Sequence, residues 1–228
     1  MPPFSVQVHW FGKVSIKKHY LFVDKRRQLL PSFFYLYCMA QPAVKYYSQE
    51  EYLAFERESP DRHEYYRGEI FNMSGASYEH NVIEDNIRVN LGSFLKGKNC
   101  RSLGSNLRVH VKENTLYTYP DVLIVCGEPE FLDNTFDTLL NPSVLFEILS
   151  PSTANYDKGV KFELYRDIQS LQEYVLVNAS KQHVEFYQRN KDNSWTLTEY
   201  KNISDVFVLQ TINKPMLLSE IYEGISFG

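Results

Sequence analysis

Glu147 is an acidic residue in the middle of an apolar run, residues 144–149, that predicts a strand covered on both faces. An ionised carboxylate in such a place costs several kcal/mol unless it is paired or bound to a metal ion. One explanation is a structural ion pair, or a strand edge at which the side chain points outward. The other is a catalytic or metal-binding role, and this residue by itself leaves both open.

Asp121 follows Pro120 directly and stands at the head of a second apolar run, residues 122–126. A Pro-Asp pair alone is typical of a turn before a strand. Together with Glu147 on another strand, however, its carboxylate could converge on one hard cation. Mg²⁺ is usually bound by one or two carboxylates, while water and substrate phosphate complete the octahedron. We therefore predict Asp121 and Glu147 as ligands of Mg²⁺, with Mn²⁺ as the alternative ion.

Lys161 lies in a helix predicted to begin after residue 154. At about 100° per residue, Asp157 and Lys161 fall inside the apolar stripe that Val160, Leu164 and Ile168 define, not opposite it. An exposed pair at this spacing would contribute only about 0.3 to 0.5 kcal/mol. Charged side chains avoid core-facing positions unless they have partners, so Lys161 is predicted to point toward the sheet.

These three residues suit the hydrolysis of a phosphodiester. That reaction needs a metal ion that polarises the phosphoryl group and activates water, carboxylates that hold the ion, and a cation that meets the developing negative charge. Asp121 and Glu147 would supply the carboxylates, and Lys161 would supply the cation.

The elements that must position these residues alternate between helix and strand. A Ser-x-x-Glu capping box at residues 48–51 predicts the start of the first helix. The predicted helices are 48–59, 77–95 and 155–168; the predicted strands are 63–74 with a bend at Gly68, 101–111, 120–126, 142–150 and 173–177; and a hairpin follows over 183–201. A strand, helix, strand succession predicts a crossover and a parallel pair. The predicted fold class is α/β (α+β with a mixed sheet), with helices flanking a central sheet and a C-terminal β-hairpin.

Composition predicts one domain behind a separate N-terminal segment. The chain has 228 residues, 43% of them hydrophobic, which suits one well-filled core. Residues 1–38 carry +5, so the remainder carries −9 of the net −4. We predict residues 1–38 as an extension outside the domain and residues 39–228 as the domain. A targeting signal is the rival interpretation, but the apolar stretch 29–40 is too short to span a bilayer and contains Pro31.

The cysteines Cys38, Cys100 and Cys126 are odd in number and form no CxxC pair, so the sequence supports neither a disulfide framework nor a zinc site. We expect a reducing, cytoplasmic compartment, no membrane partner, and Cys126 as a small buried apolar residue. The acidic body argues against broad coating of a phosphate backbone, which needs clustered Lys and Arg. It does not exclude a local phosphate site at which a metal ion supplies the positive charge.

Three stretches, YPDVLIVC, NPSVLFEILSPSTANYDKGVKFELY and QEYVLVN, together resemble one known family. They are similar to the Uma-type restriction-endonuclease-like proteins, also called domain of unknown function 820, of the PD-(D/E)xK nuclease superfamily. The resemblance covers about residues 49–189 and is specific in its combination of PD, E-x-x-SPST and D-x-x-x-K. It implies a restriction-endonuclease-like core, Mg²⁺ dependence and hydrolysis of nucleic-acid phosphodiesters.

The resemblance also implies roles for individual residues. Asp121 and Glu147 match the metal carboxylates of the superfamily, and Glu69 matches the acidic residue that some members supply from an earlier element. The usual lysine lies two positions after the glutamate, where this chain has Leu149. The resemblance implies that the lysine has moved onto the following helix as Lys161; if it has not, the site is degenerate.

Two further residues are candidates for the site. Asp157 could position Lys161 or belong to the outer shell of the metal. His80 lies one helical turn before Glu84 and could contact substrate or metal, although a lone helical histidine is more often a surface or packing residue.

The favoured hypothesis is a Mg²⁺-dependent endonuclease that hydrolyses DNA through metal-activated water. One alternative is a catalytically inactive protein that keeps the fold as a nucleic-acid or protein interaction module. Another is a metal phosphodiesterase that acts on RNA or nucleotides. Double-strand cleavage with one site per chain usually needs two chains, so a homodimer is expected by analogy.

Overall fold

The computed structural model describes residues 45–73, 75–151 and 153–227. The described residues from Tyr46 onward form one compact unit. The predicted extension, residues 1–38, lies outside the described residues, so the boundary at residue 39 stays a prediction. In the described part of the chain, no helix is long and apolar enough to cross a membrane.

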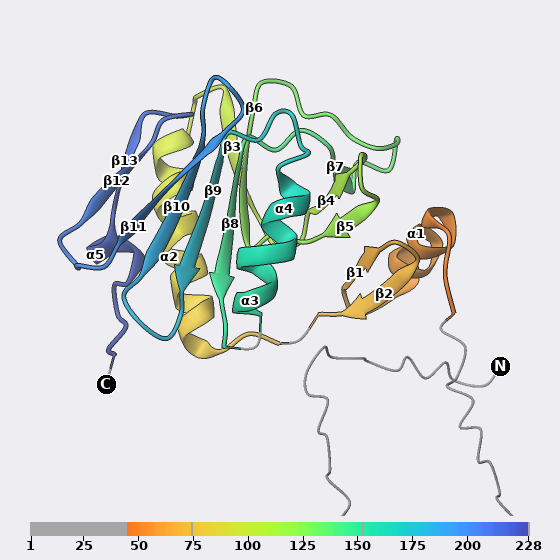
Figure 1. Cartoon of the computed structure of the whole chain (residues 1–228), viewed down its shortest axis with the longest axis horizontal. Coiled ribbons are helices and arrows are strands. Elements are labelled where there is room, and N and C mark those ends of the chain that lie inside the picture. Colours follow the sequence, from red (N-terminus) through yellow and green to blue (C-terminus); the bar gives the residue numbers. More distant parts are fainter. Residues whose placement is uncertain (1–44, 74, 152, 228) are drawn as a thin grey trace, which may run out of the picture. The chain divides into compact units, whose positions relative to one another are not determined.

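The unit contains both helices and strands (Figure 1). The helical elements are α1 (Gln49–Glu58), α2 (Tyr78–Leu95), α3 (Ala154–Tyr156), the π-helix η1 (Asp157–Lys161), α4 (Phe162–Tyr165) and α5 (Leu218–Ile221). The strands are β1 (His63–Tyr66), β2 (Glu69–Asn72), β3 (Cys100–Gly104), β4 (Arg108–Val111), β5 (Leu116–Thr118), β6 (Val122–Cys126), β7 (Thr138–Leu139), β8 (Val144–Leu149), β9 (Glu173–Asn178), β10 (Val184–Arg189), β11 (Trp195–Tyr200), β12 (Val206–Leu209) and β13 (Lys214–Leu217).

A six-stranded mixed sheet, in the order β11-β10-β9-β8-β6-β3, carries the apolar runs singled out in the sequence. β8 and β9 run parallel, which confirms the predicted crossover, whereas the other neighbouring strands run antiparallel. β10 and β11 form the predicted hairpin, and Asn193 in its turn has a φ of 64°. The predicted fold class, helices packed on a mixed sheet, is therefore confirmed.

Alternation along β6 gives this sheet two apolar faces. Val122 and Ile124 belong to one core cluster, while Leu123 and Val125 belong to another. Helix α2 packs in the first cluster and α4 in the second, so helices cover both faces (Figure 1). Strands buried on both faces are built of continuous apolar residues, and Glu147 is the charged exception in β8.

A five-stranded sheet, in the order β2-β1-β5-β4-β7, packs against the α4 side of this core. Its Val109, Val111 and Leu116 share a core cluster with Leu164 of α4. Helix α1 begins with the predicted capping box and contacts β1 through the backbone N–H of His63, which donates to a buried Glu56 carboxylate at 2.9 Å. This packing brings β1 and β5 to the helical segment that carries Lys161.

Two strands predicted as continuous are divided in the structure. Residues 63–72 form the hairpin β1–β2: the bend predicted at Gly68 is a full reversal, because Arg67 and Gly68 take positive φ angles of 47° and 93°. Residues 101–111 divide between β3 and β4, which belong to different sheets. A turn in which Leu107 donates to the carbonyl of Gly104 separates them. Both predictions were wrong because apolar alternation continued across a turn.

Cys100 and Cys126 form a disulfide, which corrects the expectation that the sequence supports none. The two residues are direct partners in the antiparallel register of β3 and β6. Cys126 therefore ties two strands together and is not merely a small apolar side chain. The cytoplasmic compartment stays a prediction, and disulfides are rare in reducing compartments; Cys38 lies outside the described residues.

Reduction of this disulfide is expected to lower the free energy of unfolding by about 2 to 4 kcal/mol, because the bond restricts the unfolded chain over a sequence separation of 26 residues. Denaturant titrations with and without a reductant measure the difference. The double variant Cys100→Ser/Cys126→Ser is the control and should match the reduced protein. Equal stability of all three samples would contradict a bond that stabilises the fold.

Candidate active site

Lys161 is the centre of a buried cluster of charges. Its Nζ lies 3.0 Å from Oε1 of Glu147, 3.0 Å from Oε1 of Glu64 and 3.6 Å from Oδ1 of Asp157. Lys161 is only 4% exposed, and so are Glu147 and Asp157. The side chain points toward the sheet, as its place in the apolar stripe predicted, and three carboxylates face it there.

The turn that presents Lys161 is the π-helix η1, which joins α3 to α4. π-turns are rare and occur frequently at functional sites. This turn keeps both Asp157 and Lys161 buried. Val160, which α-helical spacing placed in the same stripe, is instead 46% exposed. In this wider turn, Asp157 and Lys161 face the sheet while Val160 faces solvent. A regular α-helix would have turned Val160 toward the sheet beside them.

Asp121 and Glu147 meet where β6 begins beside β8. The antiparallel register pairs Val122 with Phe146, and one further step places Asp121 opposite Glu147. The carboxylate of Asp121 accepts a hydrogen bond from the backbone N–H of Ile148 at 2.6 Å. The hydrogen bond therefore fixes Asp121 against the strand that carries Glu147. Both carboxylates lie where β6 begins, on two neighbouring inner strands of the sheet.

Hydroxyl groups hold the two carboxylates closest to Lys161. The hydroxyl of Tyr165 donates to Oε1 of Glu147 at 2.8 Å, and the hydroxyl of Thr118 donates to Oε1 of Glu64. The two hydroxyl oxygens lie 3.4 Å apart. Since Glu64 lies in β1 and Thr118 ends β5, the five-stranded sheet supplies one side of the cluster and the six-stranded sheet supplies the other.

The cluster holds more acids than bases, and the pKa values of Glu147, Asp157 and Lys161 are all raised. Burial raises the pKa of Glu147 well above its usual range, and the carboxylate of Asp121 adds to this while Lys161 opposes it. Burial also raises the pKa of Asp157. Burial opposes the charge on Lys161, but Glu147 and Glu64 outweigh it and raise the pKa of this lysine. Lys161 therefore stays charged, while Glu147 and Asp157 bind protons more tightly than usual.

A second group of ligand atoms meets at Asp121. Nε2 of His80 lies 3.3 Å from Oδ2 of Asp121. The ligand atoms of His80, Glu84 and Asp121 all lie within 4.8 Å of one another. Burial raises the pKa of Glu84, and the nearby Asp121 carboxylate raises it further. Carboxylate oxygens and an imidazole nitrogen are common ligands of divalent cations, so this end of the cluster fits a metal ion.

Most of the residues singled out in the sequence lie in these two groups. The structure brings together Asp121, Glu147, Asp157, Lys161 and His80. It does not bring Glu69 into them, because Glu69 is exposed on β2 next to the hairpin turn. Glu64 on the neighbouring strand β1 contacts Lys161 instead.

Glu64, Glu84 and Tyr165 were missed as functional residues. Tyr165 stands four residues after Lys161 and Glu84 four residues after His80, so helical spacing could have indicated both. Glu64 gave no such signal, because its contact with Lys161 depends on how the two sheets pack.

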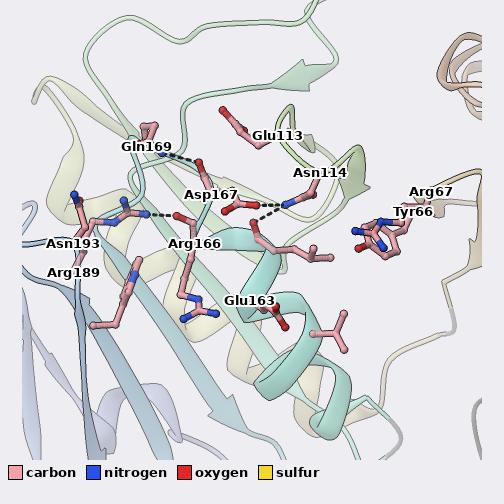
Figure 2. A pocket seen from close by; sticks show the side chains of 13 residues that line it. Tyr66, Arg67, Glu113, Asn114, Glu163, Arg166, Asp167, Gln169, Arg189 and Asn193 are labelled. Atoms are coloured by element: carbon pink, nitrogen blue, oxygen red, sulfur yellow. Dashed lines mark hydrogen bonds between the residues drawn. The ribbon is translucent and has the colours of Figure 1, made fainter.

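An open cleft of about 750 Å³ lies near the cluster, at the end of α4 (Figure 2). Val160 and Tyr66 line it. Val160 directly precedes Lys161 in the sequence, and Tyr66 follows Glu64 by two residues. Arg189 crosses its far side and donates to the carbonyl oxygen of Arg166 at 2.7 Å. The lining arginines are matched in number by acids, since Arg67, Arg166 and Arg189 stand with Glu113, Glu163 and Asp167. The cleft lining is therefore not predominantly basic.

Comparison with known proteins decides the family. The family model Uma2, described as "Putative restriction endonuclease", matches residues 49–215. The chain belongs to the Uma2 family. Two proteins of Synechocystis sp., "Uncharacterized protein slr1290" and "Uncharacterized protein sll1609", are 34% identical over 180 residues and 37% identical over 161 residues. The alignments cover 79% and 71% of this chain, and 93% and 91% of those proteins.

A crystal structure of "a putative nuclease belonging to DUF820" from Anabaena variabilis has the same fold as this Uma2 chain. The TM-score is 0.62 at 17% sequence identity, and the match covers 76% of this chain and 96% of that chain. At this identity the likeness is one of fold. Membership of the Uma2 family confirms the resemblance read from the sequence and places the chain among restriction-endonuclease-type proteins.

Proposed function

We propose that this Uma2 protein is a Mg²⁺- or Mn²⁺-dependent endonuclease that hydrolyses DNA phosphodiester bonds, with Asp121, Glu147 and Lys161 as its catalytic residues. The observation that carries the proposal is the surplus of buried carboxylates around one lysine. A structural ion pair needs one acid for each base, because every further buried charge adds a desolvation cost. A surplus of acids is what a site for a divalent cation requires.

The carboxylates are the part of the site that would hold the ion. A bound divalent cation supplies Lewis acidity toward the phosphoryl group and activates water as the nucleophile. Asp121 is oriented by the N–H of Ile148, and Glu147 by the hydroxyl of Tyr165. Groups fixed before substrate binds do not have to reorganise during the reaction, so both carboxylates are suited to this role.

Lys161 is suited to stabilise the negative charge that develops on the phosphoryl oxygens. Its pKa is raised by the carboxylates around it, so it remains a cation at neutral pH. Leu149 occupies the position at which the superfamily usually has its lysine, and it is 2% exposed in an apolar cluster. A lysine there would place an ammonium among apolar side chains, which supports Lys161 as the relocated lysine.

The family description supports DNA as the substrate, because restriction endonucleases cleave DNA. The described residues of one chain form one such cluster around a lysine. Cleavage of both strands usually needs two such sites, so we expect a homodimer on double-stranded DNA.

The function is tested by cleavage of supercoiled plasmid DNA in Mg²⁺ or Mn²⁺. Asp121→Asn and Glu147→Gln are each expected to lower the cleavage rate by about 100-fold or more, since metal activation contributes several kcal/mol. A chelator should abolish cleavage by the wild-type protein. Asp85→Asn is the matched control, because Asp85 is an exposed acid of α2 beside Glu84.

Cleavage that survives both the chelator and the two variants would contradict the proposal. DNA binding by the wild-type protein without cleavage in either ion would instead favour the inactive interaction module.

A further inference from the structure

We propose that His80 and Glu84 of α2 complete the metal site together with Asp121, and that the imidazole directs this site toward a transition-metal cation such as Mn²⁺ over Mg²⁺. The inference rests on the proposed function only in sharing Asp121 with it. It adds two side chains of α2 to the site, whereas the sequence assigned the ion to Asp121 and Glu147 alone.

The geometry of the three side chains carries the proposal. His80 and Glu84 are one turn apart on α2, and their side chains are 12% and 14% exposed beside Asp121 at 14%. Ligand atoms bind a small divalent cation at about 2.0 to 2.2 Å, so two of them lie at most about 4.4 Å apart. The three ligand atoms here already lie within 4.8 Å of one another. Small side-chain rotations would bring them onto one ion.

The hydrogen bonding of His80 points to the same role. Its Nε2 lies 3.3 Å from the Asp121 carboxylate, whereas its Nδ1 is buried and makes no hydrogen bond to the described residues. A buried polar atom without a partner costs about 1 to 3 kcal/mol. Nε2 is therefore the nitrogen that His80 presents to Asp121 and to an ion bound there.

The negative charges of Glu84 and Asp121 are only partly balanced by the cationic side chains near them. Arg88 lies 3.7 Å from Glu84, but its side chain is 48% exposed, so water screens this pair. In the described part of the chain, Asp121 forms its ion pair with His80 itself. Two adjacent carboxylates are thus neutralised poorly by the described part of the chain.

His183, Glu185 and Glu199 form another group of possible metal ligands in the described residues, but its carboxylates are already paired with lysines. Lys158 pairs with Glu185, and Lys201 pairs with Glu199 at 3.1 Å. Each carboxylate there already has a lysine, so a metal ion would have to displace one. The His183 group therefore serves as an internal control for binding at the His80 group.

The mixture of ligands decides which ion the His80 group prefers. Carboxylates and water suit Mg²⁺, Ca²⁺ and Mn²⁺ alike, while an added imidazole nitrogen favours transition metals over Mg²⁺ and Ca²⁺. Mn²⁺ accepts both oxygen and nitrogen ligands, so it matches one histidine with two carboxylates. Replacement of His80 by aspartate should move the preference toward Mg²⁺.

The test is calorimetric titration of the whole chain with Mn²⁺ or Mg²⁺ in the absence of DNA. His80→Ala is expected to weaken Mn²⁺ binding by about 10- to 100-fold and Mg²⁺ binding by less. His80→Asp should reduce the ratio of Mn²⁺ affinity to Mg²⁺ affinity. His183→Ala should leave Mn²⁺ affinity within about 2-fold of wild type, because its group is already neutralised. Circular dichroism verifies that each variant is folded.

An Mn²⁺ affinity that is unchanged in a folded His80→Ala protein would overturn the inference. Loss of binding in His183→Ala instead of His80→Ala would overturn it as well. Because the titration contains no DNA, the two proposals fail separately. A chain that binds Mn²⁺ through His80 but cleaves no DNA would refute the proposed function alone, and a chain that cleaves DNA but binds Mn²⁺ without His80 would refute this inference alone.

Discussion

Replacement of Lys161 by methionine is expected to abolish DNA cleavage and to lower the free energy of unfolding by about 3 to 5 kcal/mol. Lys161 is a buried cation whose Nζ lies 3.0 Å from both Glu64 and Glu147. Its removal leaves the buried carboxylates without a countercharge, which is more costly than the loss of an exposed pair. Cleavage assays and urea denaturation measure the two effects.

A double variant separates stability from catalysis at this position. Lys161→Met/Glu147→Gln removes one charge of each sign, so it should be more stable than Lys161→Met while remaining inactive. Lys158→Met is the matched control, because Lys158 lies in the same π-turn but is 35% exposed where it pairs with Glu185. Because Lys158 is partly exposed and faces one carboxylate where Lys161 faces three, that variant is expected to lower the free energy of unfolding by less than Lys161→Met does. Cleavage by Lys161→Met at the wild-type rate would contradict the catalytic role of Lys161.

The six-stranded sheet was predictable where local patterns determine it. The apolar runs of β6 and β8 and the helical period between β8 and β9 predicted a parallel crossover, and the spacing of turn residues predicted the β10–β11 hairpin. Turns inside an alternating pattern were only partly predictable. Gly68 indicated the place of a bend, but the alternation did not show that Arg67 and Gly68 reverse the chain there.

The disulfide was unpredictable for a related reason. Cys100 and Cys126 become neighbours only through the register of β3 and β6. A count of three cysteines says nothing about register. The sequence argument excluded a disulfide framework, and such an argument cannot exclude a single cross-strand bond.

Some residues of the candidate site could be predicted from local sequence patterns, whereas others depend on how distant parts of the chain pack. Glu147 and Lys161 each violate a local rule, since each is a charged residue at a position that strand or helix periodicity assigns to the core. Asp121 is ordinary by itself and stood out only together with Glu147 on a neighbouring strand. Such violations are visible in one sequence. Glu64 violates no rule in β1, because it becomes part of the site only when the two sheets meet around Lys161.

The two acids of the β1–β2 hairpin give the second large expected effect. Glu64→Gln should lower the cleavage rate at least about 10-fold more than Glu69→Gln does, because only Glu64 contacts Lys161. Both residues are glutamates on paired strands of one hairpin, so the comparison holds residue type and local structure constant. The family resemblance alone would favour the opposite order, with Glu69 as the important acid.

The pH dependence of cleavage distinguishes a positioning role of Glu64 from a merely structural one. Burial opposes the charge on Lys161, whereas the carboxylates of Glu147 and, to a smaller extent, Glu64 raise the pKa of this lysine. Replacement of the Glu64 carboxylate by an uncharged amide should therefore lower the pKa of Lys161. If protonated Lys161 is the form that acts, activity is full below this pKa and falls as the pH rises through it, so the alkaline limb of the profile should move to lower pH. A uniform loss of rate with no shift of that limb would mean that Glu64 only supports the fold, whereas an equal shift in Glu69→Gln would mean that Lys161 senses the charge of the whole hairpin.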